Sequence, residues 1–164
     1  MLRPGDRVAD LGCWPGGWLE VAARVVGPVG RVVGVDRVPL DAAPAPPNVV
    51  ALQGDLTDPG IADTILRRLE APADVVLCDA APKLTGVRAT DRAREEVLLE
   101  AVAALLSPLL RPGGSLVLKI LEGPEAQAVE KRILARFESA RTLRPKATRK
   151  GSAERYLVAR GFRG

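Results

Sequence analysis

Four aspartates close short apolar runs of the chain, namely Asp10, Asp36, Asp55 and Asp79. The runs that lead into them are rich in valine and leucine, which is typical of buried β-strands. If these strands are parallel, their carboxyl ends meet at one edge of the sheet, where ligands bind in open α/β folds. Carboxylates only accept hydrogen bonds and carry negative charge, so this edge suits a cationic or hydroxyl-rich ligand.

A glycine-rich turn, DLGCWPGGW, follows the first of these runs at residues 10–18. Gly12, Gly16 and Gly17 allow the backbone to approach a ligand closely, and the N-terminus of a following helix offers free N–H groups. The turn does not read G-x-G-x-x-G, and it lacks the Lys and Ser or Thr of a P-loop. The sequence therefore disfavours a pyrophosphate or triphosphate ligand at this turn.

Strands and helices that would position these residues alternate along the chain. Strands are predicted over residues 7–12, 31–36, 48–55, 74–79, 115–120 and 154–162, and helices over residues 18–26, 61–70, 89–110 and 125–137. Nearly continuous apolar strands are buried on both faces, as in a parallel sheet covered by helices. We predict an α/β fold in which a single domain, residues 1–164, holds one doubly wound, mostly parallel, Rossmann-like sheet.

Two proline-containing segments and one basic loop divide these elements. Pro108 is expected to interrupt the long helix near its end, and residues 111–114, RPGG, to turn the chain into the next strand. Residues 144–154 are expected to form a basic loop before the last strand.

The composition removes several classes of chemistry. Of 164 residues, 47% are hydrophobic and 27% charged, a balance typical of globular proteins. There is no histidine and there are two cysteines, so a Cys/His zinc site, a Ser-His-Asp triad and a histidine base are excluded. Cys13 and Cys78 fit buried thiols. No apolar run is long enough to span a bilayer, and we expect a cytoplasmic protein without a metal or a membrane partner.

Cations crowd the last quarter of the chain, at Arg141, Arg144, Lys146, Arg149, Lys150, Arg155, Arg160 and Arg163. A charge run is commonly a solvated face. Here the cations are rich in arginine and flank a candidate site, which favours a nucleic-acid partner.

S-adenosylmethionine fits the acidic edge, because it carries a sulfonium cation and two ribose hydroxyls. Asp36 could accept hydrogen bonds from the ribose, and the glycine turn could hold the methionine end. Asp55 could hold the adenine amino group or serve only as a turn residue in GDLTDPG. Asp10 could contact the ligand or fix the glycine turn by accepting its N–H groups. Because NAD enzymes also use an acid at the position of Asp36, a nicotinamide-dependent oxidoreductase is an alternative.

The motifs DLGCWPGGW, VDRVPLD, LQGDLTD, CDAAPKLTG, LVLKILEG and RPKATRKGSAERYLVARG occur in this order over essentially the whole chain. In order and spacing they resemble the FtsJ/RrmJ family of S-adenosylmethionine-dependent ribose 2′-O-methyltransferases. The resemblance implies a methyltransferase fold, S-adenosylmethionine as cofactor and RNA as substrate. Large-subunit ribosomal RNA is the first candidate substrate, and transfer RNA is the alternative.

Carried onto matching positions, the resemblance places Gly16, Trp18, Asp36, Asp55 and Asp79 around the cofactor. It also implies that Lys119 is the central catalytic residue, with Asp79 and Glu154 beside it.

Lys119 also stands out without the resemblance, because it interrupts the apolar strand SLVLKI near its carboxyl end. A lysine there is costly unless it is paired or extends to solvent, and Asp79 at the neighbouring strand end favours pairing. We expect a charged Lys119 to orient a ribose hydroxyl and stabilise the developing alkoxide, with proton abstraction as the alternative. Glu154 could instead pair with Arg155 or Lys150 at the surface.

The family resemblance also implies a basic segment before the first strand, with a further catalytic lysine. This chain starts almost on that strand, at MLRPGDRVADLG, so we expect that segment to be absent. Lys83 lies in a loop that borders the site, but nothing in the sequence makes it the substitute. A catalytically weak or inactive module that binds S-adenosylmethionine and RNA or a protein is therefore the alternative function. We expect a monomer.

Overall fold

The computed structural model describes residues 1–40, 46–82, 85–120, 124–144 and 155–164. Its elements, in chain order, are β1 (Arg7–Leu11), α1 (Gly17–Val26), β2 (Arg31–Asp36), β3 (Val49–Gln53), α2 (Ile61–Leu69), β4 (Ala73–Cys78), α3 (Arg88–Leu109), β5 (Leu110–Ile120), α4 (Pro124–Leu134), β6 (Phe137–Leu143) and β7 (Arg155–Phe162). No helix within the described ranges has the length and apolar character that crossing a membrane requires.

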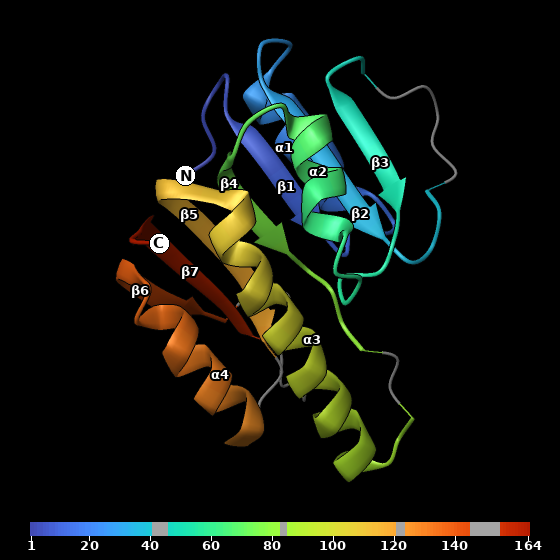
Figure 1. The fold of residues 1–164 in the computed structure, drawn as a ribbon, viewed down its shortest axis with the longest axis vertical. Helices are drawn as coiled ribbons and strands as arrows, with labels where there is room; N and C mark the ends of the chain where they lie inside the picture. Colours follow the sequence, from blue (N-terminus) through green and yellow to red (C-terminus); the bar gives the residue numbers. More distant parts are fainter. Residues whose placement is uncertain (41–45, 83–84, 121–123, 145–154) are drawn as a thin grey trace.

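The seven strands form one sheet in the order β3-β2-β1-β4-β5-β7-β6 (Figure 1). Strands β1 to β5 pair in parallel, whereas β7 pairs antiparallel with both β5 and β6. The predicted doubly wound, mostly parallel sheet is confirmed. The chain leaves β1 toward β2 and later returns to β4 on the other side of β1. The topological switch point, where such folds bind ligands, therefore lies between β1 and β4.

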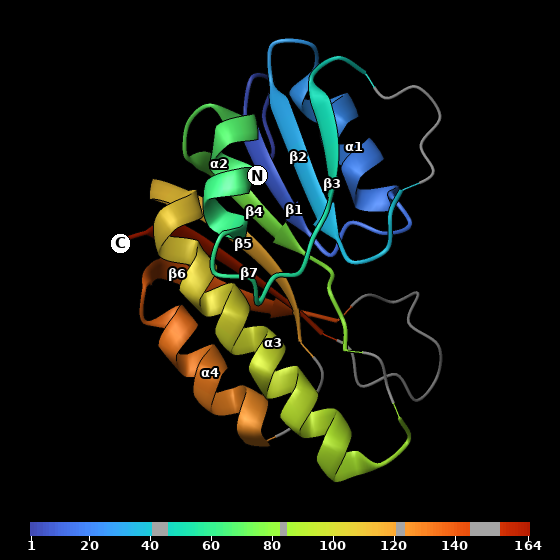
Figure 2. The same ribbon diagram turned by 45° about the vertical axis from the view of Figure 1, so that its right-hand side comes forward.

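Helices cover the two faces of the sheet unequally. α2, α3 and α4 pack on one face, through apolar residues such as Ile65, Leu106 and Val129. α1 packs on the opposite face, where Leu19 and Ala22 meet the valines of β1 and β2. Figures 1 and 2 show the three helices on one side of the sheet and α1 on the other. Burial on both faces explains why β1, β2 and β4 read as continuous apolar runs.

Strand β6 was missed in the sequence. The prediction ended a helix at Phe137, whereas α4 ends at Leu134 and Phe137 begins the edge strand β6. Phe137 is the only buried residue of this strand, and the other six are exposed. A strand with so little burial lacks the period-two apolar pattern that identifies strands in a sequence.

The segment around Pro108 also differs from the prediction. Pro108 does not interrupt α3, which continues to Leu109, because it lies in the last turn, where its missing N–H costs a single hydrogen bond. Residues 111–114 lie inside β5, which begins at Leu110. The pairing of β4 with β5 shifts register between Ala73 and Val75, which accommodates the residues that were predicted to form a turn.

Candidate active site

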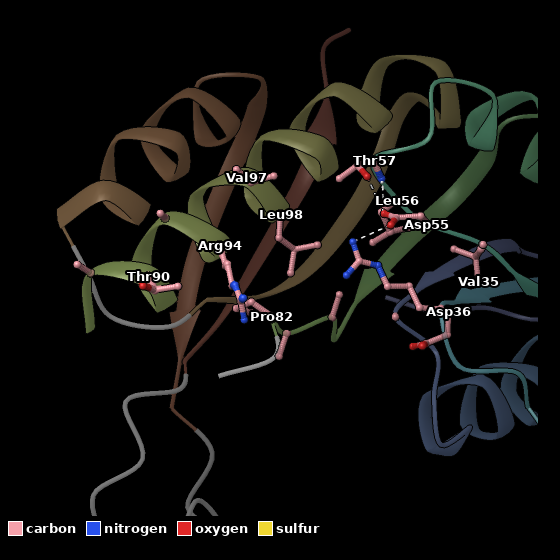
Figure 3. Close-up of a pocket in the computed structure, with 17 residues that line it drawn as sticks. Val35, Asp36, Asp55, Leu56, Thr57, Pro82, Thr90, Arg94, Val97 and Leu98 are labelled. Carbon is pink, nitrogen blue, oxygen red and sulfur yellow. Dashed lines mark hydrogen bonds and ion pairs between the residues drawn. The ribbon is translucent and has the colours of Figure 1, made fainter. Parts of the chain in front are cut away.

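A pocket of about 960 Å³ lies at the carboxyl ends of β1, β2 and β3 and extends to α3. Asp36, Asp55 and Thr57 line it from the strand ends, and Thr90 and Leu98 line it from α3. Figure 3 shows these two sets of side chains on opposite sides of the cavity. Its volume is that of sites that hold ligands of cofactor size.

The wall formed by α3 is held by a network at the start of that helix. Asp91 accepts hydrogen bonds from the backbone N–H of Thr85 at 2.6 Å, from its hydroxyl at 2.7 Å and from the N–H of Gly86 at 3.0 Å. These bonds hold the pKa of Asp91 below its usual value. They tie Thr85 and Gly86 to the first turn of α3, the helix that lines one side of the pocket.

The glycine turn between β1 and α1 is tied to the end of β2. The N–H groups of Gly12 and Cys13 donate to the carbonyl of Val35, at 2.8 and 3.2 Å. The N–H of Trp14 donates to Oδ2 of Asp36 at 3.1 Å, and Oδ1 of Asp36 accepts the N–H of Val38 at 2.9 Å. Asp36 therefore lines the pocket and orients the turn.

Gly12 is required at its position for two reasons. Its φ is +78°, in the left-handed region that favours glycine. A Cβ on Gly12 would lie 2.5 Å from the Cα of Ala80, the second residue after β4. Since Gly12 and Ala80 both line the pocket, a side chain at Gly12 would push apart the two segments that form its floor.

Asp55 stabilises the turn after β3 and also lines the pocket. Its Oδ1 accepts hydrogen bonds from the N–H of Thr57 at 2.9 Å and from the Thr57 hydroxyl at 2.8 Å. Its Oδ2 lies 2.7 Å from the guanidinium of Arg37, and Figure 3 draws the contacts of Asp55 on the strand-end side of the pocket. The hydrogen bonds from Thr57, and then Arg37, hold the pKa of Asp55 below its usual value.

Lys119 pairs with Asp79, as the sequence predicted. Its ammonium donates to the backbone carbonyl of Asp79 at 2.6 Å and lies 3.2 Å from Oδ1 of the same residue. The side chain of Lys119 is only 10% exposed, so it does not extend to solvent. The ammonium is instead fixed at the carboxyl end of β5, next to the switch point.

Tyr156, the only tyrosine of the chain, completes this pair. It lies opposite Lys119 in the β5–β7 register, and its hydroxyl donates to Oδ1 of Asp79 at 3.1 Å. Its ring packs on Trp18 of α1, with ring centroids 5.5 Å apart. Trp18 therefore supports the Lys119–Asp79 pair through Tyr156.

Asp10 is fully buried at the end of β1, with an exposed fraction of 0%. Neither carboxyl oxygen accepts a hydrogen bond from the described part of the chain. The hypothesis that Asp10 fixes the glycine turn is therefore wrong, because the carbonyl of Val35 and the carboxylate of Asp36 do so. Burial, followed by the negative charges of Asp79 and Asp36, raises the pKa of Asp10 to about 7.

The two cysteines are buried thiols, as predicted. Burial raises the pKa of Cys13 and of Cys78 to about 12, so both thiols stay protonated and unreactive near neutral pH. Among the described residues, no group of three or more Cys, Asp or Glu side chains is arranged to hold a metal ion.

A family model described as FtsJ-like methyltransferase matches residues 1–162. The chain belongs to the FtsJ-like methyltransferase family. The recognition made from the motifs is thereby confirmed, together with the enzyme class and the cofactor, S-adenosylmethionine, that it implied.

Individual proteins agree with this family. The chain is 43% identical over 164 residues to the ribosomal RNA large subunit methyltransferase E of Methanothermobacter thermautotrophicus, covering 100% of this chain and 77% of that protein. Among solved structures, a Plasmodium falciparum protein assigned as a ribosomal RNA methyltransferase has a TM-score of 0.83 at 22% identity, covering 100% and 90% of the two chains. Aeropyrum pernix fibrillarin, solved with natively bound S-adenosylmethionine, has a TM-score of 0.68 at 19% identity, covering 96% and 67%.

The cofactor residues predicted for this FtsJ-like methyltransferase fall into two groups. Gly12, Asp36 and Asp55 line the pocket. Gly16, Gly17 and Trp18 form the start of α1 and are not among its lining residues, and Asp79 precedes the lining residue Ala80.

Two further predicted positions cannot be placed, because Glu154 and Lys83 lie outside the described residues. Arg155, which was considered as a partner of Glu154, forms a two-pronged ion pair with Glu130 of α4, with both N–O distances 2.6 Å.

Sequence analysis missed Arg37 and Tyr156 in this FtsJ-like methyltransferase. Arg37 directly follows Asp36, which could have indicated its proximity to the pocket. Tyr156 is the only tyrosine and lies two residues after the predicted Glu154, in a strand whose alternate residues share one face. Only the register of β7 against β5 shows that this face is the one that carries Lys119.

Proposed function

We propose that this chain transfers the methyl group of S-adenosylmethionine to a ribose 2′-hydroxyl of RNA, with large-subunit ribosomal RNA as the first substrate to test. The observation that carries the proposal is the partly buried Lys119–Asp79 pair beside a pocket of cofactor size, in a chain of the FtsJ-like family. Relatives that match the whole chain are large-subunit ribosomal RNA methyltransferases by name.

The described residues fit S-adenosylmethionine. The glycine at position 12 leaves the space that a Cβ would fill, so the backbone can lie against a ligand. Asp36 has carboxylate oxygens in the pocket for ribose hydroxyls, and Asp55 has an oxygen that can accept from the adenine amino group. When bound, this cofactor supplies an electrophilic methyl group on a sulfonium cation.

Lys119 orients and activates the substrate hydroxyl. An ammonium has three N–H donors, of which one donates to the carbonyl of Asp79, while Oδ1 of Asp79 forms an ion pair with the same group. A further donor remains for a ribose 2′-oxygen and stabilises the negative charge that develops there as the methyl group passes from sulfur to oxygen and the hydroxyl proton leaves to solvent. The ammonium lies in an ion pair with the Asp79 carboxylate, and an ammonium has no lone pair to accept a proton, which argues for this role over proton abstraction.

Tyr156 and Trp18 keep Asp79 and Lys119 in position for this step. The hydroxyl of Tyr156 holds Oδ1 of Asp79, so the carboxylate cannot rotate away from the ammonium. Methyl transfer requires the attacking oxygen and the methyl carbon to be close and collinear with the leaving sulfur. Such positioning contributes about 7–11 kcal/mol to the lowering of a barrier. Fixing the lysine is therefore a large part of what the protein supplies.

An RNA partner is supported by exposed arginines in the C-terminal strands. Arg141 and Arg144 lie on and just after β6, and Arg160 and Arg163 lie on and just after β7, all exposed. Such cations bind phosphates without regard to sequence and contribute most of the non-specific affinity for a nucleic acid. A monomer that acts on RNA in the cytoplasm remains the prediction for its biological setting.

The test is transfer of a labelled methyl group from S-adenosylmethionine by this chain to ribosomal subunits and to protein-free RNA, with Lys119→Ala beside it. We expect label at a ribose 2′-oxygen with the wild-type chain and none with the variant. Cofactor binding without transfer to either substrate would overturn the proposal and favour a binding module. Label in a base or in protein would overturn the ribose assignment alone.

A further inference from the structure

Asp10 is the one side chain of the described residues whose polar atoms are buried without any hydrogen-bond partner. It lies at 0% exposure under the turn that begins with Gly12, a residue that lines the pocket. A buried carboxyl group without partners destabilises a fold, particularly when it is charged. Neither the glycine turn nor the Lys119–Asp79 pair requires this carboxyl group for its own hydrogen bonds.

The sheet register places Asp10 on the face that carries the catalytic pair. Asp10 lies opposite Gly34 of β2 and Leu77 of β4. Asp36 and Asp79 follow two residues after these partners, on the same face and closer to the carboxyl edge, because side chains alternate along a strand. Three carboxyl groups therefore share a small region next to the switch point.

The groups that face Asp10 come from every element around it. β2 contributes Asp36, the segment after β4 contributes Asp79, and the glycine turn contributes the thiol of Cys13. The thiol of Cys78 lies on the opposite face of β4, close enough for the charge of Asp10 to affect it. The thiols are neutral near pH 7 because their pKa values are about 12.

From the far side of Asp79, β5 contributes the ammonium of Lys119. α1 covers this face with the apolar side chains of Leu19 and Ala22.

These surroundings leave Asp10 close to its titration midpoint at neutral pH. Burial raises its pKa to about 7, and the charges of Asp79 and Asp36 add to that effect. A positive charge that arrives nearby favours the charged carboxylate, and its removal favours the neutral acid. The ionisation state of Asp10 is therefore sensitive to the charge of a ligand in this region.

Methyl transfer changes the ligand charge in this region. The sulfonium of S-adenosylmethionine is a cation, whereas the thioether of S-adenosylhomocysteine, the demethylated product, is neutral. The sulfonium must lie beside the Lys119–Asp79 pair if the methyl group is to reach an oxygen that Lys119 holds. The N–H of Asp79 donates to the carbonyl of Leu11, the residue directly after Asp10, at 3.2 Å. Methyl transfer therefore removes the positive charge of the sulfonium close to Asp10.

We propose that Asp10 is the residue by which the site distinguishes S-adenosylmethionine from S-adenosylhomocysteine. Its carboxyl group releases a proton to solvent when the sulfonium cation binds, and it takes up a proton from solvent when the neutral thioether is left behind. The carboxylate stabilises the cofactor by charge, and the protonated acid leaves the product without that stabilisation. The inference rests on the proposed function, because it assumes that S-adenosylmethionine occupies this site.

The test compares affinities for three ligands from about pH 5.5 to about pH 8.5, on either side of the Asp10 midpoint. The ligands are S-adenosylmethionine, S-adenosylhomocysteine and sinefungin, in which an amine carries the positive charge. Titration calorimetry on the wild-type chain, Asp10→Asn and Asp63→Asn gives each dissociation constant. Asp63, exposed in the first turn of α2, is the control for removal of a carboxylate far from the site.

We expect the preference of the wild-type chain for the two cationic ligands over S-adenosylhomocysteine to rise about tenfold or more across this range, since one pKa unit corresponds to a factor of ten. Asp63→Asn should behave as the wild type. In Asp10→Asn this rise in preference with pH should vanish. Any part of the rise that comes from titration of the ligands' own amino groups should remain in this variant. An equal rise in Asp10→Asn, or no rise in the wild type, would overturn the inference.

A measurement on the wild-type chain avoids dependence on the folding of Asp10→Asn. With ¹³C-labelled aspartate, NMR should show one carboxyl group that titrates near neutral pH in the free protein. Sinefungin should shift that titration to lower pH, and S-adenosylhomocysteine should shift it less. Equal shifts with both ligands would overturn the inference while leaving methyl transfer intact. If no ligand binds at any pH, the cofactor site of the proposed function fails and this inference fails with it.

Discussion

The ammonium of Lys119 lies 3.2 Å from Oδ1 of Asp79 and donates to the carbonyl of that same residue at 2.6 Å. One aspartate thus fixes the lysine at two points, through its side chain and through its backbone. Because the backbone contact survives when the carboxylate is neutral, the position of the ammonium does not depend on charge alone. The backbone carbonyl of Asp79 can therefore hold the ammonium in position, while the carboxylate of Asp79 stabilises its charge.

Substitution of Lys119 tests whether charge or proton abstraction matters. Lys119→Ala should lower kcat by about 10²–10⁴-fold and leave S-adenosylmethionine affinity nearly unchanged. Lys119→Arg keeps the positive charge and cannot act as a base, so it should retain a substantial part of the activity. The measurement is single-turnover methyl transfer at saturating cofactor. If the Arg variant is as inactive as the Ala variant while both bind cofactor, a purely electrostatic role would be excluded.

Tyr156→Phe tests the hydroxyl that holds Asp79. The variant keeps the ring that packs on Trp18 and removes the hydroxyl that donates to Oδ1 of Asp79 at 3.1 Å. Loss of one such bond to a charged group costs about 1.5–3 kcal/mol, and we expect kcat to fall by about ten- to a hundredfold. The cofactor dissociation constant should stay within about twofold of the wild type, because the hydroxyl positions the Lys119–Asp79 pair and affects kcat rather than cofactor binding. An unchanged kcat would show that the Lys119 contacts alone hold Asp79.

Gly12→Ala tests the close approach of the glycine turn to Ala80. The new Cβ would meet the backbone of Ala80 at 2.5 Å, at a residue whose φ is +78°. Stability should fall by at least about 1–3 kcal/mol, and cofactor affinity should fall as well. Gly17→Ala is the matched control for stability, because its Cβ has no heavy atom within 4 Å and it begins α1. Denaturant unfolding checks both, and equal stability of the two variants would contradict the steric argument.

Most of the sheet could be predicted from the sequence, because burial on both faces leaves a local signal. The strands that end at Asp10, Asp36 and Asp79 read as continuous apolar runs bounded by turn residues. The same topology brings the carboxyl ends together, so the acidic edge and the Lys119–Asp79 pair follow from strand order alone. Strand β6 gave no such signal, because six of its seven residues are exposed.

Contacts that depend on register could not be predicted in the same way. That Tyr156 faces Lys119 depends on the alignment of β7 with β5, across a segment that no local pattern positions. That Arg37 reaches Asp55 depends on the loop between β3 and α2. The isolation of Asp10 is also a tertiary property, because a sequence shows that a carboxyl group is present but not that its oxygens are buried away from hydrogen-bond donors.

The pH dependence of stability should reveal the buried acid. The pKa of Asp10 is about 7 in the fold, against 3.8 for an exposed aspartate. The fold therefore favours the neutral acid, whose contribution is complete below about pH 4 and is lost as pH rises through about 7. The full difference corresponds to roughly 4 kcal/mol, at 1.36 kcal/mol per pKa unit. Urea unfolding should show that Asp10→Asn gains stability relative to the wild type as pH rises from about 4 to 8, whereas Asp63→Asn should show no such trend.

The ion pair of Glu130 with Arg155 should be a major stabilising contact of the C-terminal half. Both side chains are only 12% exposed, and the two-pronged pair joins α4 to the first residue of β7. Glu130→Ala removes both of these short contacts from a guanidinium that is largely shielded from water and should cost about 3–5 kcal/mol in unfolding free energy. Glu20→Ala removes the partner of the exposed Arg24, both more than 70% exposed, and should cost no more than about 0.5 kcal/mol. Thermal and urea unfolding measure both, and comparable losses would show that burial does not set the strength of these pairs.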